Sequence, residues 1–416
     1  MVRPRQAGGP QRGTMAMANN IHGPLTGVTV VDLGQIYNGP YCTFLMAMAG
    51  ARVIKVEPRG GENLRRRAKV GGAAVPFAML NSNKEFITLD LKTARGKVLI
   101  REMVAKADVL IENFSQGAME RLGLGYDALK QVNPGLIYAS GSGYGRSGPM
   151  KNYPAMDIAV QAMSGLMSIN GFEDRPPVKV GPAVADFLGG VHLYAAVVTA
   201  LYERRATGEG RLVEVSMMES VYPSLASNLG LYYANKGQVS ARTGNRHGGM
   251  AESPYNVYPS SDGYVAIVAS NDAQWNRLLT VIGRTELVGD ERYATLGARV
   301  QRMDEVDAIV SAFTTPRTKN DAFQQLVTAN VTCAPVRDIG EVVNDEQMLG
   351  RKALEWVEHP LYGRMPLPRS SLRFSDTPMP AIEPSGEVGR DNASVFGEWL
   401  GLGPEALAEL VREQII

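Results

Sequence analysis

Stretches suited to buried strands alternate with stretches suited to helices through the first part of the chain. Residues 27–34 predict a buried strand that ends at a turn, and residues 39–50, rich in small and apolar side chains, predict a short helix. Residues 51–57 predict the next strand, which the turn at 58–61 stops. Because parallel strands need a crossover connection, usually a helix, this unit predicts a parallel sheet with right-handed crossovers.

The alternation continues as far as residue 140. Further strands are predicted at 86–90, 108–112 and 136–140, with helices at 93–105 and 126–132. The first 200 residues therefore predict an open α/β fold. In such sheets, ligands bind beyond the carboxyl ends of the strands. This places the candidate site in the loops that follow Leu33, Glu57, Glu112 and Ser140.

The second half of the chain follows a different pattern. A long helix, a strand and a helical stretch are predicted first, at 187–204, 211–216 and 217–236. Residues 237–253 are then polar, glycine-rich and basic, and we place a boundary there. Beyond it the pattern predicts a strand at 263–268 and a mostly helical stretch at 275–332. Residues 335–416 mix short strands with proline-rich turns and end in a helix at 404–414.

Composition excludes several classes of protein. The 43 Lys and Arg residues balance 42 Asp and Glu residues, so the overall charge favours neither nucleic acid nor a membrane as a partner. Two cysteines, Cys42 and Cys333, rule out a disulfide scaffold and fit a reducing compartment. The four histidines have no metal-ligand spacing, so no metal site is expected.

Neither a signal peptide nor a membrane-spanning helix is expected. Residues 1–20 contain no apolar run, and we interpret them as a loose extension. The rest of the chain contains no stretch of roughly 18 or more apolar residues. The expected location is therefore cytoplasmic.

A glycine-rich run at 141–148 follows a predicted strand. A dinucleotide-binding loop would lead directly into a helix, whereas this run ends in Gly148-Pro149, which is typical of a turn. We interpret it as a loop whose glycines allow close backbone approach. The motifs of nucleoside triphosphatases and of α/β-hydrolases do not occur.

Asp186 is the strongest single candidate for chemistry. It comes directly before a long apolar helix, so it could be a plain N-cap. A functional interpretation is compatible with that role, because the helix dipole would hold the carboxylate ionised. The small neighbours and Gly189-Gly190 would leave space for a substrate, and their amides could contact an oxyanion. An ionised carboxylate in such a site can act as a covalent nucleophile.

Other charged residues also have plain structural interpretations. Asp157 starts another apolar helix and could be a plain cap of that helix. A basic group in the first half of the chain could be a solvated face or the rim of a site for a polyanionic small molecule. Its members are Arg59, Arg65, Arg66, Arg67, Lys69, Lys84, Lys92, Arg95 and Arg121.

Several runs of the sequence together resemble the class III CoA-transferases. This group contains the formyl-CoA:oxalate and carnitine CoA-transferases and the α-methylacyl-CoA racemases. The resemblance extends from about residue 24 to the C-terminus and is densest up to about residue 220. The matching segments are 24–33, 39–40, 50–57, 83–84, 89–92, 108–114, 133–134, 143–145, Asp157 with 161–165, Asp186, and 207–210.

The resemblance implies an α/β fold with two domains. A large Rossmann-like CoA-binding domain would comprise residues 24–225 and 336–416, and a smaller α+β domain with its linkers would comprise residues 226–335. Residues 1–23 would be a flexible N-terminal extension. Two ring-like chains would interlock into a homodimer.

The resemblance also implies a CoA-transferase of acyl-CoA metabolism, whose partners are an acyl-CoA and a carboxylic acid. Asp186 falls on the catalytic aspartate, which forms covalent aspartyl anhydride and thioester intermediates. Supporting roles fall on Asp157, Gln161, His247, Gly248 and Gly249. Segments that hold CoA contain Tyr37, Asn38, Arg59, Lys92, Asn113, Phe114, Ser115, Arg121 and Lys151. CoA is a substrate here, and no tightly bound cofactor is expected.

Two alternatives to CoA transfer stay open. A racemase needs two groups that move protons at the α-carbon. Its pattern near Asp157 is His-Asp, but Met156 stands in the histidine position, and a thioether moves no protons. Transfer is therefore favoured over racemisation. The other alternative is a catalytically silent CoA-binding dimer. Gln161, Met163, Met167 and the loop around His247 are expected to line the pocket for the acceptor acid.

Overall fold

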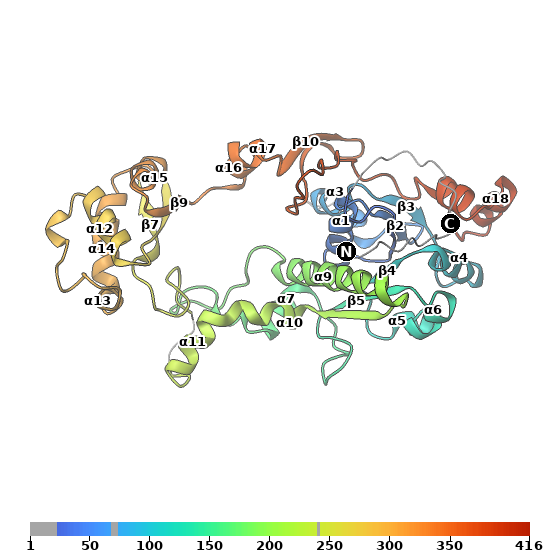
Figure 1. The fold of residues 1–416 in the computed structure, drawn as a ribbon, viewed down its shortest axis with the longest axis horizontal. Coiled ribbons are helices and arrows are strands. Elements are labelled where there is room, and N and C mark those ends of the chain that lie inside the picture. Colours follow the sequence, from blue (N-terminus) through green and yellow to red (C-terminus); the bar gives the residue numbers. More distant parts are fainter. Residues whose placement is uncertain (1–22, 68–73, 239–241) are drawn as a thin grey trace, which may run out of the picture.

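The structure, a computed structural model, describes residues 23–67, 74–238 and 242–416. Apart from Gly23, the predicted N-terminal extension at 1–23 lies outside the described residues, and so does Lys69 of the basic group. Over the described ranges the chain is a mixed α/β protein, as the alternation of strands and helices predicts (Figure 1).

A six-stranded sheet forms the centre of the larger part of the molecule. Its strands follow the order β3-β2-β1-β4-β5-β6, and every neighbouring pair is parallel, which confirms the predicted parallel α/β sheet. The chain order reverses between β1 and β4, and ligands bind at such switch points in open α/β sheets. The strands are β1 (Thr29–Asp32), β2 (Arg52–Glu57), β3 (Glu85–Thr88), β4 (Val109–Glu112), β5 (Ile137–Ser142) and β6 (Leu212–Ser216).

Helices connect these strands and follow the last of them. In chain order they are α1 (Asn38–Met48), α2 (Asn63–Arg67), α3 (Ala74–Leu80), α4 (Ala94–Lys106), α5 (Ala118–Leu122), α6 (Tyr126–Val132), α7 (Asp157–Met163), α8 (Leu166–Ile169), α9 (Val184–Thr207), α10 (Met217–Val221) and α11 (Ala226–Ala234). The continuous helix predicted at 217–236 is divided, because a 3₁₀ turn with a proline in its first turn, Tyr222–Leu225, separates α10 from α11.

Both faces of the parallel sheet are buried. Val31 and Leu110 pack on one face with α4, and Val30 and Val109 pack on the other face with α1 and α9. Alternate residues of a strand point to opposite faces, so strands covered on both sides are apolar at most positions. This accounts for the nearly continuous apolar runs that made the strands recognisable in the sequence.

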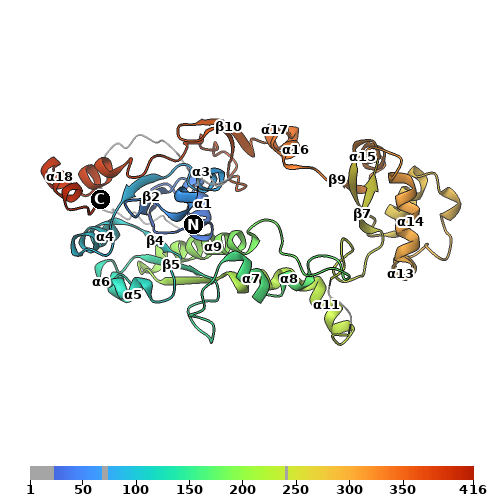
Figure 2. The same ribbon diagram turned by 180° about the vertical axis from the view of Figure 1, so that it is seen from behind.

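The C-terminal residues return to the parallel sheet. Phe396 and Ile415 belong to the same buried cluster as α4 and the first strands. Two hydrogen bonds reinforce the contact: the N–H of Asp90 donates to the carbonyl of Ile415 (2.8 Å), and the N–H of Phe86 donates to Asp391 (2.6 Å). Residues more than 300 positions apart in sequence therefore share one core (Figure 2).

Helix α9 is longer than predicted and begins earlier. It spans Val184–Thr207 rather than 187–204, and Ala183 occupies its N-cap position. Asp186 is thus inside the first turn, and the interpretation of Asp186 as the N-cap is wrong. By length and composition alone α9 could cross a membrane, but Leu193 and Val197 are buried against the sheet, as expected of a core helix.

A second, antiparallel sheet lies apart from the first in both views (Figures 1 and 2). It contains β7 (Tyr255–Ser260), β8 (Gly263–Val268) and β9 (Thr332–Pro335). Trp275 and Leu278 belong to a separate buried cluster with strand residues of this sheet. The remaining helices of this part are α12 (Asp272–Val281), α13 (Leu296–Val300), α14 (Met303–Thr314) and α15 (Lys319–Thr328), with a 3₁₀ turn at Thr285–Leu287.

Two stretches of chain join the two sheets. One passes through α11, and the other leaves β9 through two short helices toward a hairpin beside the first sheet (Figure 1). These last elements are α16 (Ile339–Val343), α17 (Glu346–Gly350), β10 (Leu354–His359), β11 (Gly363–Pro368), a π-helix at Ala393–Trp399 and α18 (Pro404–Arg412). The predicted domain boundaries at 225 and 335 stay a prediction.

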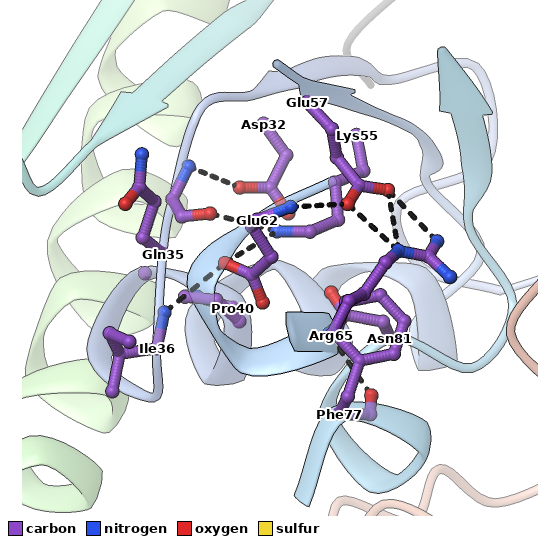
Figure 3. Close-up of polar contacts among 12 residues, drawn as sticks. Asp32, Gln35, Ile36, Pro40, Lys55, Glu57, Glu62, Arg65, Phe77 and Asn81 are labelled. Carbon is purple, nitrogen blue, oxygen red and sulfur yellow. Dashed lines mark hydrogen bonds and ion pairs between the residues drawn. The ribbon is translucent and has the colours of Figure 1, made fainter. Parts of the chain in front are cut away.

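Buried charged side chains hold the turn that follows β1 (Figure 3). The Lys55 ammonium donates to the carbonyl of Gly34 (2.8 Å), and the N–H of Ile36 donates to Glu62 (3.3 Å). Lys55 and Glu62 also form an ion pair at 3.8 Å with both side chains only 1% exposed. Ile36 has a φ of +63°, which a β-branched residue rarely adopts. The buried pair therefore stabilises a turn that the backbone alone disfavours.

Two more ion pairs surround the first. Arg65 donates to both carboxylate oxygens of Glu57 (2.8 Å at the closest), and Lys84 donates to Asp32 (3.0 Å). Asp32 in turn accepts the N–H of Gly34 (2.8 Å). Burial lowers the pKa of Lys84 to about 8. Burial alone would favour the neutral acid at Asp32, but Lys84 holds the pKa of that carboxyl below its usual value.

We expect Lys55→Met to destabilise the protein strongly, because it leaves Glu62 buried without its cation. The free energy of unfolding, measured by urea titration, should fall by about 3–5 kcal/mol. Arg211→Met is the control, because it breaks an exposed ion pair with Glu203 (2.5 Å) and should cost no more than about 1 kcal/mol. Equal losses in the two variants would contradict a structural role for the buried pair.

The separate cluster beneath the antiparallel sheet makes a second prediction. Leu278 is fully buried there, so Leu278→Ala should lower the free energy of unfolding of this part by about 2–5 kcal/mol. Val327→Ala on the nearby helix α15 removes a 43% exposed side chain and should change it by less than about 0.5 kcal/mol. Urea unfolding followed by tryptophan fluorescence compares the two. A similar small effect of both changes would show that the cluster contributes little.

Candidate active site

Asp186 lines a cavity at the carboxyl ends of β4 and β5, where the sheet topology predicts a ligand. The cavity has a volume of about 390 Å³, and Asp186 is only 7% exposed. Segments from several elements converge on it. The residues that line it are Gln35, Ile36, Asn38, Asn63, Arg67, Asn113, Phe114, Ser115, Gln116, Gly141, Ser142, Gly143, Tyr144, Lys151, Tyr153, Pro154, Ala155, Met156, Asp186 and Met217.

Asp157 caps the helix that carries Asp186. Its Oδ1 accepts the backbone N–H groups of Ala185 (2.8 Å) and Asp186 (3.2 Å), which are two of the donors left unpaired at a helix N-terminus. The interpretation of Asp157 as the cap of its own helix is wrong, since Met156 is the N-cap of α7 and makes no side-chain cap bond. The carboxylate instead joins the start of α7 to the start of α9.

The surroundings of Asp186 favour its protonated form. Burial, and after it the charge of Asp157, raises the pKa of Asp186 to about 7. Desolvation and a like charge thus oppose the helix dipole, which was expected to hold this carboxylate ionised. The group is still close to half ionised at neutral pH, so it can act as a base or a nucleophile there.

The side chain of Asn38 fills the space beside two glycines. Its amide donates to the carbonyl of Asp186 (3.4 Å), which connects the start of α1 to α9. A Cβ at Gly141 would lie 2.2 Å from Oδ1 of Asn38, and a Cβ at Gly189 would lie 2.3 Å from Nδ2. The expectation that Gly189 and Gly190 leave room for a substrate is thus wrong: Asn38 occupies the space at Gly189, and Asn38 and Tyr41 occupy that at Gly190.

Five of the nine residues expected to hold CoA line the Asp186 cavity: Asn38, Asn113, Phe114, Ser115 and Lys151. Two more, Arg59 and Lys92, line a second cavity of about 410 Å³ beyond β2. Gln35 and Phe114 line both cavities, so the two spaces are adjacent.

Tyr37 and Arg121 line neither of these two cavities. The ring of Tyr37 stacks on Phe187 with a centroid distance of 5.9 Å. Arg121 is exposed and its guanidinium donates to the carbonyl of Gln116 (3.4 Å). The structure places Arg121 on the short helix α5, whose Leu122 lines the second cavity.

None of the loop residues His247, Gly248 and Gly249 lines the Asp186 cavity. Gly249 lines a different cavity, together with Phe172 and Arg246, and the His247 ring contacts Tyr255 at 5.4 Å. Of the side chains expected to line the acceptor pocket, Met163 is 44% exposed. Gln161 is fully buried and bonds to Asp157 (2.6 Å) instead of lining the cavity.

The basic group of the sequence divides into three. Arg65 and Lys84 are buried in the ion pairs that support the turn after β1. Arg67, like Arg59 and Lys92, lines one of the two cavities. The others that the structure describes, Arg66, Arg95 and Arg121, are exposed. Some members of the group are therefore solvent-exposed, and others line a cavity, as the two interpretations of the sequence predict.

Sequence reasoning assigned no site role to Gln35, Tyr144 and Tyr153, which are among the other side chains that line the Asp186 cavity. Gln35 and Tyr144 lie in loops that follow Leu33 and Ser140, which the sheet pattern had marked without singling out these residues. Over the described ranges, no group of three or more His, Cys, Asp or Glu side chains is placed to hold a metal ion.

Comparison with known proteins agrees with this geometry. Among solved structures, a CAIB/BAIF family protein from Brucella suis matches with a TM-score of 0.79 and 33% identity, over 90% of this chain and 99% of that one. An acetyl-CoA:oxalate CoA-transferase from Acetobacter aceti is 40% identical over 80% of this chain and 85% of its own length. A succinate–glutarate CoA-transferase from Agrobacterium fabrum is 35% identical over 90% and 95%.

A third relative, a succinyl-CoA–D-citramalate CoA-transferase from Chloroflexus aurantiacus, is 32% identical over 94% of this chain and 98% of its own length. The sequence pattern of CoA-transferase family III matches residues 25–392, which is nearly the whole chain. The resemblance noted in the sequence is thereby confirmed, and this chain belongs to CoA-transferase family III, a family of enzymes.

Proposed function

We propose that this enzyme transfers CoA from an acyl-CoA thioester to a short dicarboxylic acid, with Asp186 as the nucleophile. The observation that carries the proposal is a buried carboxylate in a cavity that adjoins a second cavity, which Arg59 and Lys92 line. The relatives are named for oxalate, succinate, glutarate and D-citramalate, all short dicarboxylates. Arg67 and Lys151 line the Asp186 cavity and could pair with a second carboxylate.

The two adjacent cavities suit the two ends of an acyl-CoA. We place the thioester beside Asp186 and the phosphates near Arg59 and Lys92, where cations are available. The connecting arm would pass between them along Gln35 and Phe114, which line both spaces. CoA is a substrate in this scheme, and the residues require no tightly bound cofactor.

The proposed reaction exchanges acyl bonds without transferring a proton. A carboxylate oxygen of Asp186 attacks the thioester carbonyl, the C–S bond breaks, and CoA leaves as a thiolate, which gives an aspartyl anhydride. The thiolate attacks the aspartyl carbonyl, releases the donor acid and forms an aspartyl-CoA thioester. The acceptor carboxylate attacks this thioester, the C–S bond breaks, and CoA leaves again as a thiolate, which gives a second anhydride. The thiolate attacks the acceptor carbonyl of this anhydride, which forms the new acyl-CoA and frees the Asp186 carboxylate. A partly closed cavity keeps water from the intermediates.

Racemisation is the second candidate, and the cavity does not favour it. A racemase needs a proton-moving group on each face of the α-carbon. Met156 lines the cavity at the position where the racemases carry histidine, and no described residue that lines this cavity is a histidine. A silent CoA-binding dimer is the third candidate, and the geometry of Asp186 offers no support for it.

We extend the proposal to the assembly and its parts. Two chains, each with a Rossmann-like large domain (24–225 and 336–416) and a small α+β domain (226–335), would interlock as rings into a cytoplasmic homodimer. None of the residues of α11 is buried in the single chain, and Tyr232 and Tyr233 expose at least half of their surface. Such a face is typical of a protein interface. In such a dimer, the loop around His247 would lie near the Asp186 of the other chain.

We expect Asp186→Ala and Asp186→Asn to lose CoA transfer by about 10⁴-fold or more, because the covalent route needs the carboxylate oxygen. The assay combines acyl-CoA donors with dicarboxylate acceptors and identifies the products by mass spectrometry. Hydroxylamine or borohydride trapping should mark Asp186 in the unmodified enzyme. Asp174→Asn, at an exposed carboxylate, is the matched control and should leave the rate unchanged.

Three results would reject this role of Asp186. Substantial transfer by both folded variants would exclude the nucleophile. Deuterium uptake at C2 of a 2-methylacyl-CoA, in heavy water and without an acceptor acid, would indicate the racemase. Tight CoA binding without turnover for any donor would indicate the silent dimer.

The place of the nucleotide is tested at Lys92. Lys92→Met removes a cation that lines the second cavity and should raise KM for acyl-CoA by about tenfold with little change in kcat. Arg95→Met removes an exposed cation three residues away that lines neither cavity, and KM should stay the same. Equal KM values for the two variants would place the nucleotide elsewhere.

A further inference from the structure

Two carboxylates are held together at the first turn of α9. Asp157 accepts the backbone N–H of Asp186 itself (3.2 Å) and that of Ala185 (2.8 Å). Its other oxygen accepts the Gln161 amide (2.6 Å). Both oxygens of Asp157 are therefore engaged, and the group cannot turn away from the helix without losing these bonds.

Gln161 makes this arrangement rigid. Its side chain is fully buried, and its Oε1 accepts the N–H of Val180 (2.9 Å). Its amide also lies 3.3 Å from the carbonyl of Pro182, in the segment that leads into α9. The position of the Asp157 charge relative to Asp186 is thus set by α7 and by the 180–182 segment together.

Few charged side chains other than Asp157 lie near Asp186. The titratable groups that share the cavity with Asp186 are Arg67 of α2, and Tyr144, Lys151 and Tyr153 of the loop between β5 and α7, while Tyr37 lies before α1. Over the described part of the chain, none of the cations forms an ion pair with Asp186. Burial and the charge of Asp157 raise the pKa of Asp186. Burial also raises the pKa of Tyr37, and the charges of Asp186 and Asp157 raise it further.

We propose that Asp157 is a positioning residue whose negative charge promotes acylation of Asp186. This inference rests on the proposed function. The ionised Asp186 is repelled by Asp157, and that repulsion disappears when Asp186 is converted into an uncharged acyl group. In the first step the negative charge leaves with the CoA thiolate, and in the second it leaves with the donor acid. Both covalent states of Asp186 are therefore favoured over the free carboxylate.

The charge and the cap can be separated by substitution. Asp157→Asn keeps an oxygen that can accept the two amides of α9 but removes the charge. Asp157→Ser does the same with a shorter side chain, and it carries the test should the first variant fold poorly. Gln161→Met removes one hydrogen bond from Asp157 but keeps its charge, and the two bonds from α9 still hold the carboxylate beside Asp186. Asp338→Asn makes the same chemical change at the cap of α16, outside both cavities.

The experiment measures transfer rates between pH 5 and pH 9 with succinyl-CoA as the donor probe. It also measures, by intact-mass spectrometry after rapid quenching, the fraction of enzyme that carries CoA on Asp186. In Asp157→Asn the acidic limb of the kcat/KM profile should move to lower pH by about 1 pH unit. At pH 8 the covalent fraction should fall by about tenfold, because a less basic carboxylate is a weaker nucleophile.

The ratio of variant to unmodified activity should therefore rise as the pH falls. A purely structural role would lower the rate equally at every pH. Gln161→Met and Asp338→Asn should leave the acidic limb where it is. An unchanged limb and an unchanged covalent fraction in Asp157→Asn, with CoA still found on Asp186, would overturn this inference alone. No covalent CoA on Asp186 in the unmodified enzyme would overturn the proposed function.

Discussion

The site depends on two hydrogen bonds from the first amides of α9 to the carboxylate of Asp157. They satisfy donors that a helix start otherwise leaves unpaired, and they do so with a residue from another helix. The same contact determines where Asp186 lies and which charge it faces. A capping interaction, which elsewhere contributes only stability, here also sets the electrostatic environment of the Asp186 carboxylate.

The opposite wall of the site is supported by buried charge as well. The pairs Lys55–Glu62, Arg65–Glu57 and Lys84–Asp32 hold a turn in which Ile36 has a positive φ. Buried ion pairs of this kind add little net stability, but removing one partner is costly, so they define one arrangement strongly. Because Gln35 of this turn lines both cavities, a fixed turn also fixes the part of the wall that the two cavities share.

Much of the fold could be predicted because its signals are local. Strands buried on both faces are largely apolar, which marked β1, β2 and β4 directly. The carboxyl ends of β4 and β5 marked the loops around Asn113 and Gly141. The cap of α9 could not be predicted in this way, since Asp157 lies 29 positions before Asp186 and local capping rules consider only neighbours. The same is true of Asn38, which fills the space of two distant glycines, and of the burial that makes Asp186 a weaker acid than expected.

The packing of Asn38 against Gly141 and Gly189 restricts how the family can diverge at these places. A larger residue at either glycine would overlap the carboxamide, so it is tolerable only in a lineage where position 38 has first become smaller. Once such a residue has been acquired, return of the asparagine is blocked. The three positions are therefore expected to change in a fixed order, and an ancestor rebuilt one position at a time would pass through an overpacked, less stable intermediate if that order were ignored.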